Sequence, residues 1–168
     1  MTGSRVLLMS DTHLPRRAKD LPPALWRAVD EADLVIHAGD WMEVDLLDRL
    51  EARSARLLGC WGNNDGEDLR ARLPEVARAT VEGVRVAVVH ETGSKDRRGE
   101  RMRRDYPDVD LLVFGHSHIP WDTSHDGLRL LNPGSPTDRR REPDFTWMTL
   151  RLADGGVHDV VLHRLAPH

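Results

Sequence analysis

The fold is decided close to the N-terminus by the stretch Arg5-Val6-Leu7-Leu8-Met9-Ser10-Asp11-Thr12-His13, which joins an apolar run directly to a carboxylate and an imidazole. A short apolar run bounded by polar residues is typical of a buried strand. The run therefore predicts a strand over residues 5–10 that ends at Asp11.

The same arrangement, an apolar strand followed by polar groups, recurs along the chain. Four more such strands are predicted: residues 34–38 before Gly39-Asp40, 55–60 before Gly62-Asn63, 84–89 before His90, and 110–114 before Gly115-His116-Ser117-His118. In open α/β sheets, ligands gather beyond the carboxyl ends of the strands. We therefore expect these polar side chains to converge on one edge of the molecule.

The groups that end these strands are oxygen and nitrogen ligands, and none is a thiolate. The candidate metal ligands are Asp11, His13, Asp40, Asn63, His90, His116 and His118. This mixture suits two hard or borderline divalent metals better than one structural zinc. A site with two metals indicates chemistry on phosphate esters.

Helical patterns separate the first three strands, over residues 22–32, which Pro22 and Pro23 open, and over residues 43–53. This alternation favours right-handed crossovers and a parallel sheet. Turn residues make the second half mostly antiparallel, with a charged helix over 97–105 and strands over 77–82, 84–89, 121–125, 128–131, 146–152 and 157–165. We expect one α/β domain over residues 1–168, with two sheets packed face to face and helices outside.

Size and composition narrow the classes of function. A chain of 168 residues fits one domain with a core, and its net charge of -4 argues against binding along an extended nucleic acid. The single cysteine, Cys60, excludes an internal disulfide. No apolar run has the length of a membrane span, and residues 6–9 are too short for a signal peptide. We expect a cytoplasmic protein that does not bind membranes.

Together, the five clusters resemble the calcineurin-like metallophosphoesterase superfamily, whose pattern is D-x-H, G-D, G-N-x-D or G-N-x-E, H, and G-H-x-H. All five blocks occur here in that order. The late segment Leu131-Asn132-Pro133-Gly134-Ser135-Pro136 resembles the compact prokaryotic phosphodiesterase branch of that superfamily. The resemblance implies a four-layer α/β/β/α fold, a sandwich of two mixed β-sheets flanked by helices.

The resemblance also implies roles for the ligands. Asp11, His13 and His118 would hold the first metal, Asn63, His90 and His116 the second, and Asp40 would bridge both. Strand-like alternation in residues 115–118 is expected to point both imidazoles the same way. Metals about 4 Å apart would share a water and lower its pKa to about 7, giving the hydroxide that attacks phosphorus. Mn²⁺ is the expected metal, with Fe, Ni, Co and Zn as alternatives.

Two positions depart from the superfamily pattern. Asn64 stands where many members have a histidine, and its amide can donate a hydrogen bond but cannot supply a proton. We therefore expect leaving groups that depart as stable anions, or proton delivery by solvent. Glu91 replaces a glycine, and it either orients a ligand histidine or is solvated. The residues expected to take part in catalysis are Asp40, Asn63, Asn64 and His116, and Asn64 is also expected to contact substrate.

The remaining polar and aromatic residues are given structural roles, with one exception. Asp65 is expected to orient the Asn63-Asn64 turn, and His37 to be structural. Three tryptophans are expected to pack under the loops rather than stack on substrate, and the basic run over residues 97–104 to be a solvated face. The exception is Arg139, the candidate for a phosphate contact. The tryptophans are Trp41, Trp61 and Trp121.

Three functions compete at this point. The first is a metal-dependent phosphodiesterase that acts on a small substrate. The second is a phosphomonoesterase or nucleotide pyrophosphatase with the same metal core. The third is an interaction scaffold, the role of a retromer subunit of this fold. Whether the chain forms a homo-oligomer is left open.

Overall fold

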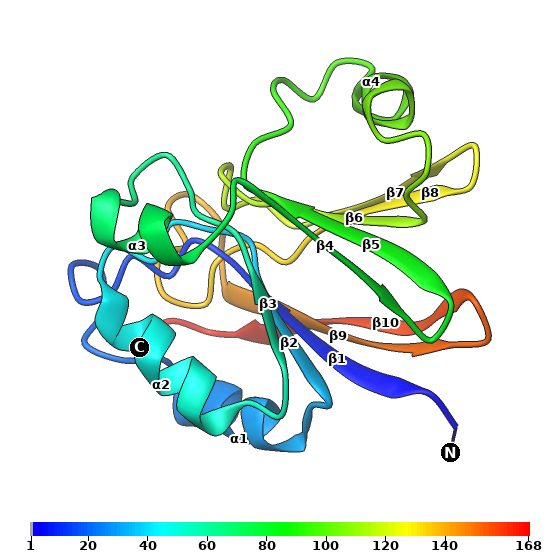
Figure 1. Cartoon of the computed structure of the whole chain (residues 1–168). Coiled ribbons are helices and arrows are strands. Elements are labelled where there is room, and N and C mark those ends of the chain that lie inside the picture. Colours follow the sequence, from blue (N-terminus) through cyan, green and yellow to red (C-terminus); the bar gives the residue numbers. More distant parts are fainter. Residues whose placement is uncertain (1) are drawn as a thin grey trace.

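The computed structural model describes residues 2–168, which form two five-stranded sheets (Figure 1). The first sheet has the order β10-β9-β1-β2-β3. Its parallel part consists of β1 (Ser4–Met9), β2 (Leu34–His37) and β3 (Leu57–Gly59), joined by α1 (Pro23–Glu31) and α2 (Val44–Arg53). On the other side of β1, β9 (Phe145–Ala153) and β10 (Gly156–Leu165) are antiparallel neighbours.

The second sheet has the order β4-β5-β6-β8-β7. Its strands are β4 (Val76–Val81), β5 (Val84–Val89), β6 (Leu111–Val113), β7 (Trp121–His125) and β8 (Leu128–Asn132). The pairs β4–β5 and β7–β8 are antiparallel, whereas β5, β6 and β8 are parallel to one another. Two mixed sheets are therefore present, as the sequence predicted. Between β5 and β6 the chain forms α4 (Arg98–Asp105).

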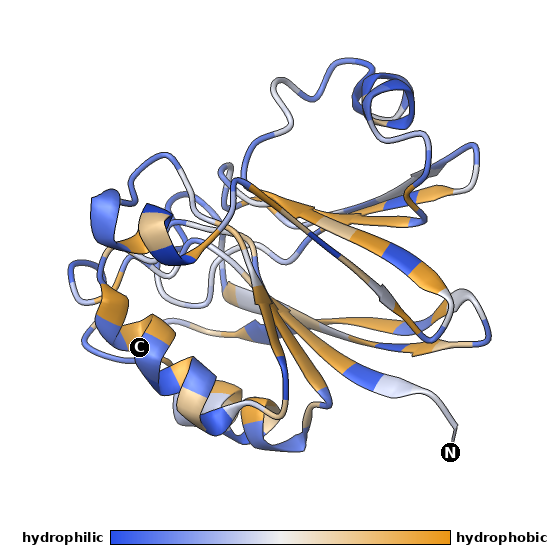
Figure 2. Ribbon diagram, viewed as in Figure 1, coloured by the Kyte–Doolittle hydropathy of each residue, from blue (hydrophilic) through white to orange (hydrophobic). Residues whose placement is uncertain are grey.

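The four predicted layers are visible in the packing of the apolar side chains. Alternate residues of β1 face opposite ways: Val6 and Leu8 join the core between the sheets, while Leu7 and Met9 join the core under α1 and α2. A third cluster packs Met102 of α4 against the outer face of the second sheet. Figure 2 shows apolar residues along the strands and polar residues on the outward faces of the helices. Because both faces of β1 are buried, its sequence is a continuous apolar run.

The short helix α3 (Glu67–Arg72) was not expected from the sequence. Leu69 is its one buried residue, so six residues carry too little apolar periodicity to predict it. Within residues 2–168, no helix combines the length and the apolar content that a membrane crossing requires.

The basic run around α4 is only in part the solvated face that was predicted: the side chains of Arg97 and Arg104 are 72% exposed, but other arginines of the run are packed. Arg98 is only 8% exposed, and its guanidinium carbon lies 4.8 Å and 4.5 Å from the ring centres of Phe114 and Trp121. The guanidinium of Arg103 donates to the carbonyl oxygens of Tyr106 and Val109. The charges thus hold the helix and its flanking loops to the second sheet, a tertiary role that a run of like charges does not reveal.

Candidate metal centre

The loops that follow the strands are joined to one another by backbone hydrogen bonds. Beyond β1 and β2, the N–H of Asp11 donates to Gly39 O at 2.9 Å, and the N–H of His13 donates to Asp40 O at 3.0 Å. In the second sheet the N–H of Gly115 donates to His90 O at 3.0 Å. The predicted clusters therefore meet at one edge of the sandwich.

Most of the candidate ligands have a left-handed backbone. Positive φ angles occur at Asp11 (55°), His13 (46°), Asp40 (61°), His116 (76°) and His118 (62°). Such conformations are uncommon outside glycine and are held in place by the surrounding structure, often at functional sites. The predicted strand-like geometry of residues 115–118 is thus wrong, because both histidines are placed by turns instead.

Two glycines make the close approach of these loops possible. A Cβ atom added to Gly62 would lie 2.5 Å from the backbone nitrogen of Asp40. One added to Gly115 would lie 2.6 Å from Asp11 Oδ2 and 3.1 Å from Ser10 Cβ. Only a residue without a side chain fits at these two positions.

Five candidate ligands form a buried cluster: Asp11, His13, Asp40, His90 and His118. The Nε2 atom of His90 lies 3.3 Å from Asp40 Oδ2 and 3.6 Å from Asp11 Oδ1. His13 Nε2 lies 3.4 Å from Asp40 Oδ2, and His118 Nε2 lies 3.4 Å from Asp11 Oδ1. The donor atoms within this cluster fall into two groups, one around Asp11, His13 and His118 and one around Asp11, Asp40 and His90.

Four of the atoms that point into the cluster lack hydrogen-bond partners within the described part of the chain. Among residues 2–168, none is found for four buried atoms: Asp11 Oδ1, His13 Nε2, His90 Nε2 and His118 Nε2. Burying an unpaired polar atom costs about 1–3 kcal/mol, so four together require an explanation. Divalent cations would satisfy all four atoms.

The opposite nitrogens of two imidazoles are fixed by backbone carbonyls. His90 Nδ1 donates to Ala38 O at 2.7 Å, and His118 Nδ1 donates to Asp138 O at 2.5 Å. In the neutral imidazole that binds a metal, this arrangement directs the lone pair of each Nε2 into the cluster, as is usual for a metal-ligating histidine. The donor set therefore fits divalent metal ions.

The electrostatic field of the cluster favours positive charge. Burial opposes ionisation of the Asp11 carboxyl, but the imidazoles of His118 and His13 outweigh burial and hold the pKa of Asp11 well below its ordinary value. Burial also disfavours the imidazolium form of His90, yet Asp40 and Asp11 outweigh it and raise the pKa of His90 to about 9. Bound cations would supply the charge that these carboxylates attract.

Asn63 and His116 lie at the exposed rim of the cluster. Asn63 Oδ1 is 3.2 Å from His116 Nδ1, and the ring of His116 meets the ring of His90 edge to face at 5.3 Å. The backbone N–H of His116 donates to Asp11 Oδ2 at 3.0 Å. Glu91 is half exposed, with its Oε1 atom 3.7 Å from His116 Nδ1. Glu91 thus lies beside a candidate ligand while remaining in contact with solvent.

Asn64 contacts Asp40 through two groups. Its backbone N–H donates to Asp40 Oδ1 at 2.9 Å, and its side-chain amide donates to Asp40 Oδ2 at 2.8 Å. Asp65 accepts hydrogen bonds from the N–H groups of Gly62, Asp40 and Met42, so it organises the turn as predicted. The substrate contact of Asn64 remains a prediction.

His37 is structural, as the sequence indicated. It is fully buried, and its ring stacks on Trp41 with 3.7 Å between ring centres. Burial lowers the pKa of His37 to about 3, so the ring is neutral. Its Nδ1 accepts the N–H of Gly39, which assigns the proton to Nε2 facing Thr12 Oγ1. Trp41 and His37 thus support the loop that carries Asp40.

Residues after β8 also support the site. Ser135 Oγ donates to Asp11 O at 2.8 Å, and Thr137 Oγ1 donates to Thr12 O at 2.6 Å. The segment over residues 131–136 resembles a family branch, but its sequence does not predict the contacts to Asp11 and Thr12. They fix the backbone of the loop between Asp11 and His13.

Two of the three arginines after this segment contact different groups. Arg139 Nη1 donates to Glu142 O at 2.9 Å, and its guanidinium carbon lies 6.0 Å from the ring centre of Phe145. Arg140 Nη1 lies instead 3.4 Å from the carbonyl oxygen of His116. The phosphate contact of Arg139 stays a prediction. Arg140 belongs to the same basic run but was not the predicted phosphate contact, and it reaches the loop that holds His116.

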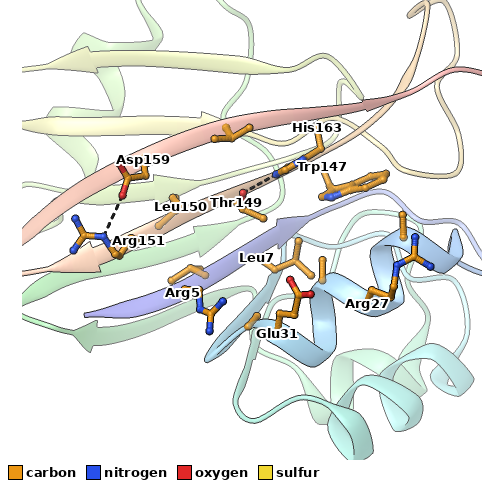
Figure 3. A pocket seen from close by; sticks show the side chains of 15 residues that line it. Arg5, Leu7, Arg27, Glu31, Trp147, Thr149, Leu150, Arg151, Asp159 and His163 are labelled. Atoms are coloured by element: carbon orange, nitrogen blue, oxygen red, sulfur yellow. Dashed lines mark hydrogen bonds and ion pairs between the residues drawn. The ribbon is translucent and has the colours of Figure 1, made fainter. Parts of the chain in front are cut away.

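A separate groove of about 520 Å³ lies on the outer face of the first sheet (Figure 3). Leu7, Trp147 and Thr149 line it, together with Arg27 and Glu31 of α1. None of the seven candidate ligands lines this groove. It is therefore distinct from the candidate metal centre.

Binding of Mn²⁺ should raise the melting temperature of the chain. A ligand that binds only the folded state, and is present at about 100 times its Kd, stabilises that state by about 2.7 kcal/mol. This stabilisation shifts Tm by about 5–10 °C in a chain of this size. Differential scanning calorimetry in EDTA and in excess Mn²⁺ measures the shift. Mg²⁺ at the same concentration controls for ionic strength, and equal melting temperatures in EDTA and Mn²⁺ would contradict the site.

Comparison with known proteins agrees with this geometry. Residues 5–155 match the calcineurin-like phosphoesterase superfamily domain. A probable metallophosphoesterase from Methanothermobacter thermautotrophicus is 33% identical over 161 residues, which cover 94% of this chain and 90% of that protein. A phosphodiesterase from Methanocaldococcus jannaschii is 21% identical over 146 residues, covering 77% of this chain and 82% of that protein.

The fold is also found in a solved structure. A single mutant of Vps29 from Entamoeba histolytica aligns over 98% of this chain and 99% of its own, with a TM-score of 0.77 and 21% identity. At that identity the likeness concerns the fold alone. The family is shown instead by the match over residues 5–155 and by the 33% identity to the archaeal relative. The chain belongs to the calcineurin-like phosphoesterase superfamily.

Proposed function

We propose that this chain is a phosphodiesterase that uses two divalent metal ions, with Mn²⁺ as the preferred metal. The observation that carries the proposal is the convergence of four buried ligand atoms without partners among residues 2–168. Family membership and the phosphodiesterase among its relatives support the same chemistry.

The proposed ligand sets start from the two groups of donor atoms, in which Asp11 is the residue common to both, but assign the shared role to Asp40. Asp11, His13 and His118 would hold one ion, and His90 would hold the other together with Asn63 and His116 at the rim. Asp40 would be shared, because its Oδ2 atom faces both His13 and His90, at 3.4 Å and 3.3 Å. When bound, a pair of divalent cations supplies a hydroxide nucleophile at neutral pH and neutralises charge on the phosphoryl group.

The polypeptide contributes orientation. The two N–H groups of Asn64 hold both oxygens of Asp40, which fixes the carboxylate between the ligand sets. His116 lies at the open side of the cluster, with half of its side chain exposed, where a substrate enters. Asn64 next to it can donate a hydrogen bond to a phosphoryl oxygen but cannot protonate a leaving group. This chemistry favours esters of acidic alcohols and phenols.

The rate of hydrolysis should depend steeply on the pKa of the leaving group. Without a side-chain acid at position 64, negative charge accumulates on the departing oxygen, and each rise in leaving-group pKa slows the reaction. A series of aryl methyl phosphates with substituted phenols, assayed in Mn²⁺, measures the slope. Asn64→His is the matched variant, and it should flatten that slope. A slope near zero in the parent chain would contradict the absence of a general acid.

A direct test compares two nitrophenyl substrates. With Mn²⁺, we expect bis(p-nitrophenyl) phosphate to be hydrolysed with a higher kcat/KM than p-nitrophenyl phosphate. The opposite order would favour the phosphomonoesterase alternative. The scaffold alternative is considered because the chain shares its fold with Vps29. It would be favoured if the folded protein binds Mn²⁺ but hydrolyses neither these esters nor nucleotide polyphosphates.

A further inference from the structure

We infer that Arg140 binds an anionic group of the substrate beyond the scissile ester, so that the preferred substrates are phosphodiesters carrying a second phosphate. The inference rests on the phosphoesterase function proposed above and names the substrate class for the same site. The observations behind it are the position of the guanidinium, its lack of a competing carboxylate, and its exposure.

The position follows from the backbone and one contact. Arg140 has a left-handed backbone, with φ of 51°, and its Nη1 atom lies 3.4 Å from the carbonyl oxygen of His116. The imidazole of His116 faces Asn63 and His90. The guanidinium therefore lies beside the loop that carries His116, outside the buried candidate ligands.

The guanidinium has free binding capacity. Within residues 2–168, Arg140 makes no ion pair, and its contact to His116 O is long for a hydrogen bond. Asp138, the carboxylate two residues earlier in the sequence, is paired with Arg17 instead, with 3.5 Å between Oδ2 and Nε. An exposed guanidinium with unused N–H donors is suited to bidentate binding of phosphate.

The position of Arg140 gives two phosphates of one substrate different binding partners. A scissile phosphate would be held by cations at the buried cluster, which neutralise it without help from Arg140. A second phosphate on the outer side of His116 would lie beyond both proposed ligand sets, and Glu91 beside His116 would repel it. Arg140 supplies the positive charge that such a group needs at this edge.

The experiment uses two diesters that differ only in the second phosphate: thymidine 5′-(p-nitrophenyl phosphate) and the same compound with a 3′-phosphate. We expect the parent chain in Mn²⁺ to prefer the 3′-phosphorylated diester, mainly through a lower KM. Arg140→Ala should reduce that preference about tenfold, the order of one charge-assisted hydrogen bond at an exposed site. Arg140→Lys should keep part of it, because a point charge remains.

Arg141→Ala is the matched control, because Arg141 is an exposed arginine with no side-chain hydrogen bond or ion pair among residues 2–168. It should change the preference by less than about twofold. An equal loss in Arg141→Ala would overturn the assignment, since the effect would then reflect general charge. An equal loss of both diesters in Arg140→Ala would also overturn it, since Arg140 would then act on the loop.

A second readout separates this inference from the proposed function. Isothermal titration calorimetry compares the binding of thymidine 3′,5′-bisphosphate and thymidine 5′-phosphate to Mn²⁺-loaded protein. If the parent chain hydrolyses neither diester, the phosphodiesterase proposal fails, and calorimetry still decides the role of Arg140. Tighter binding of the bisphosphate that disappears in Arg140→Ala supports the role, and equal binding of both nucleotides overturns it.

Discussion

Replacing Asp40 by asparagine should lower the Mn²⁺-dependent hydrolysis of a phosphodiester by about 10³-fold or more. Losing a residue that only hydrogen-bonds to a metal ligand costs about 10–100-fold, and losing a ligand shared by two ions should cost more. Asp40 Oδ2 faces His13 and His90 at 3.4 Å and 3.3 Å, so it borders both ligand sets. An amide has one oxygen and no charge, and it cannot serve two cations.

Metal content distinguishes loss of the site from loss of the fold. Elemental analysis of Asp40→Asn after dialysis against Mn²⁺ should find fewer ions per chain than in the parent. Without metal, the variant should melt close to the parent, since the backbone N–H of residue 40 still donates to Asp65 at 3.0 Å. Asp45→Asn, at a carboxylate that is 76% exposed on α2, is the control. Turnover within tenfold of the parent would contradict a shared role for Asp40.

The edge at which the site forms could be predicted from the sequence. Each apolar run ends where its candidate metal ligands begin, and the ends of parallel strands must lie at one edge of a sheet. This reasoning needs only burial and chain direction. It placed Asp11 after β1 and His90 after β5, where the structure has them.

The local geometry could not be predicted, because it depends on contacts between distant segments. His116 and His118 were expected to alternate along a strand, yet both have positive φ, and their loop is fixed through Asp11 Oδ2 and Asp138 O. Arg98 was counted with a solvated run, but the rings of Phe114 and Trp121 cover it. The pattern of residues along the chain does not show which distant residues will contact one another.

The second large effect on activity is expected at Gly115, where the added group is a single methyl. Added to Gly115, a methyl group would lie 2.6 Å from Asp11 Oδ2 and 3.1 Å from Ser10 Cβ. Contacts under 3 Å are not tolerated, so either Asp11 or the loop of His116 must move. Asp11 Oδ2 also accepts the N–H of His116 at 3.0 Å, and displacing it disturbs both sides of the cluster of candidate ligands.

We therefore expect Gly115→Ala to lower kcat/KM for a diester by about 100-fold, as displacements of about 1 Å at a catalytic site do, and to destabilise the fold by about 1–3 kcal/mol. Steady-state kinetics in Mn²⁺ and urea unfolding in EDTA measure the two effects. Gly66→Ala is the matched control, because nothing lies within 4 Å of its added Cβ. Since Ser10 Oγ is the nearest obstacle, adding Ser10→Ala to Gly115→Ala should restore part of the activity. Full activity in Gly115→Ala alone would show that the two loops are not held as close as the structure places them.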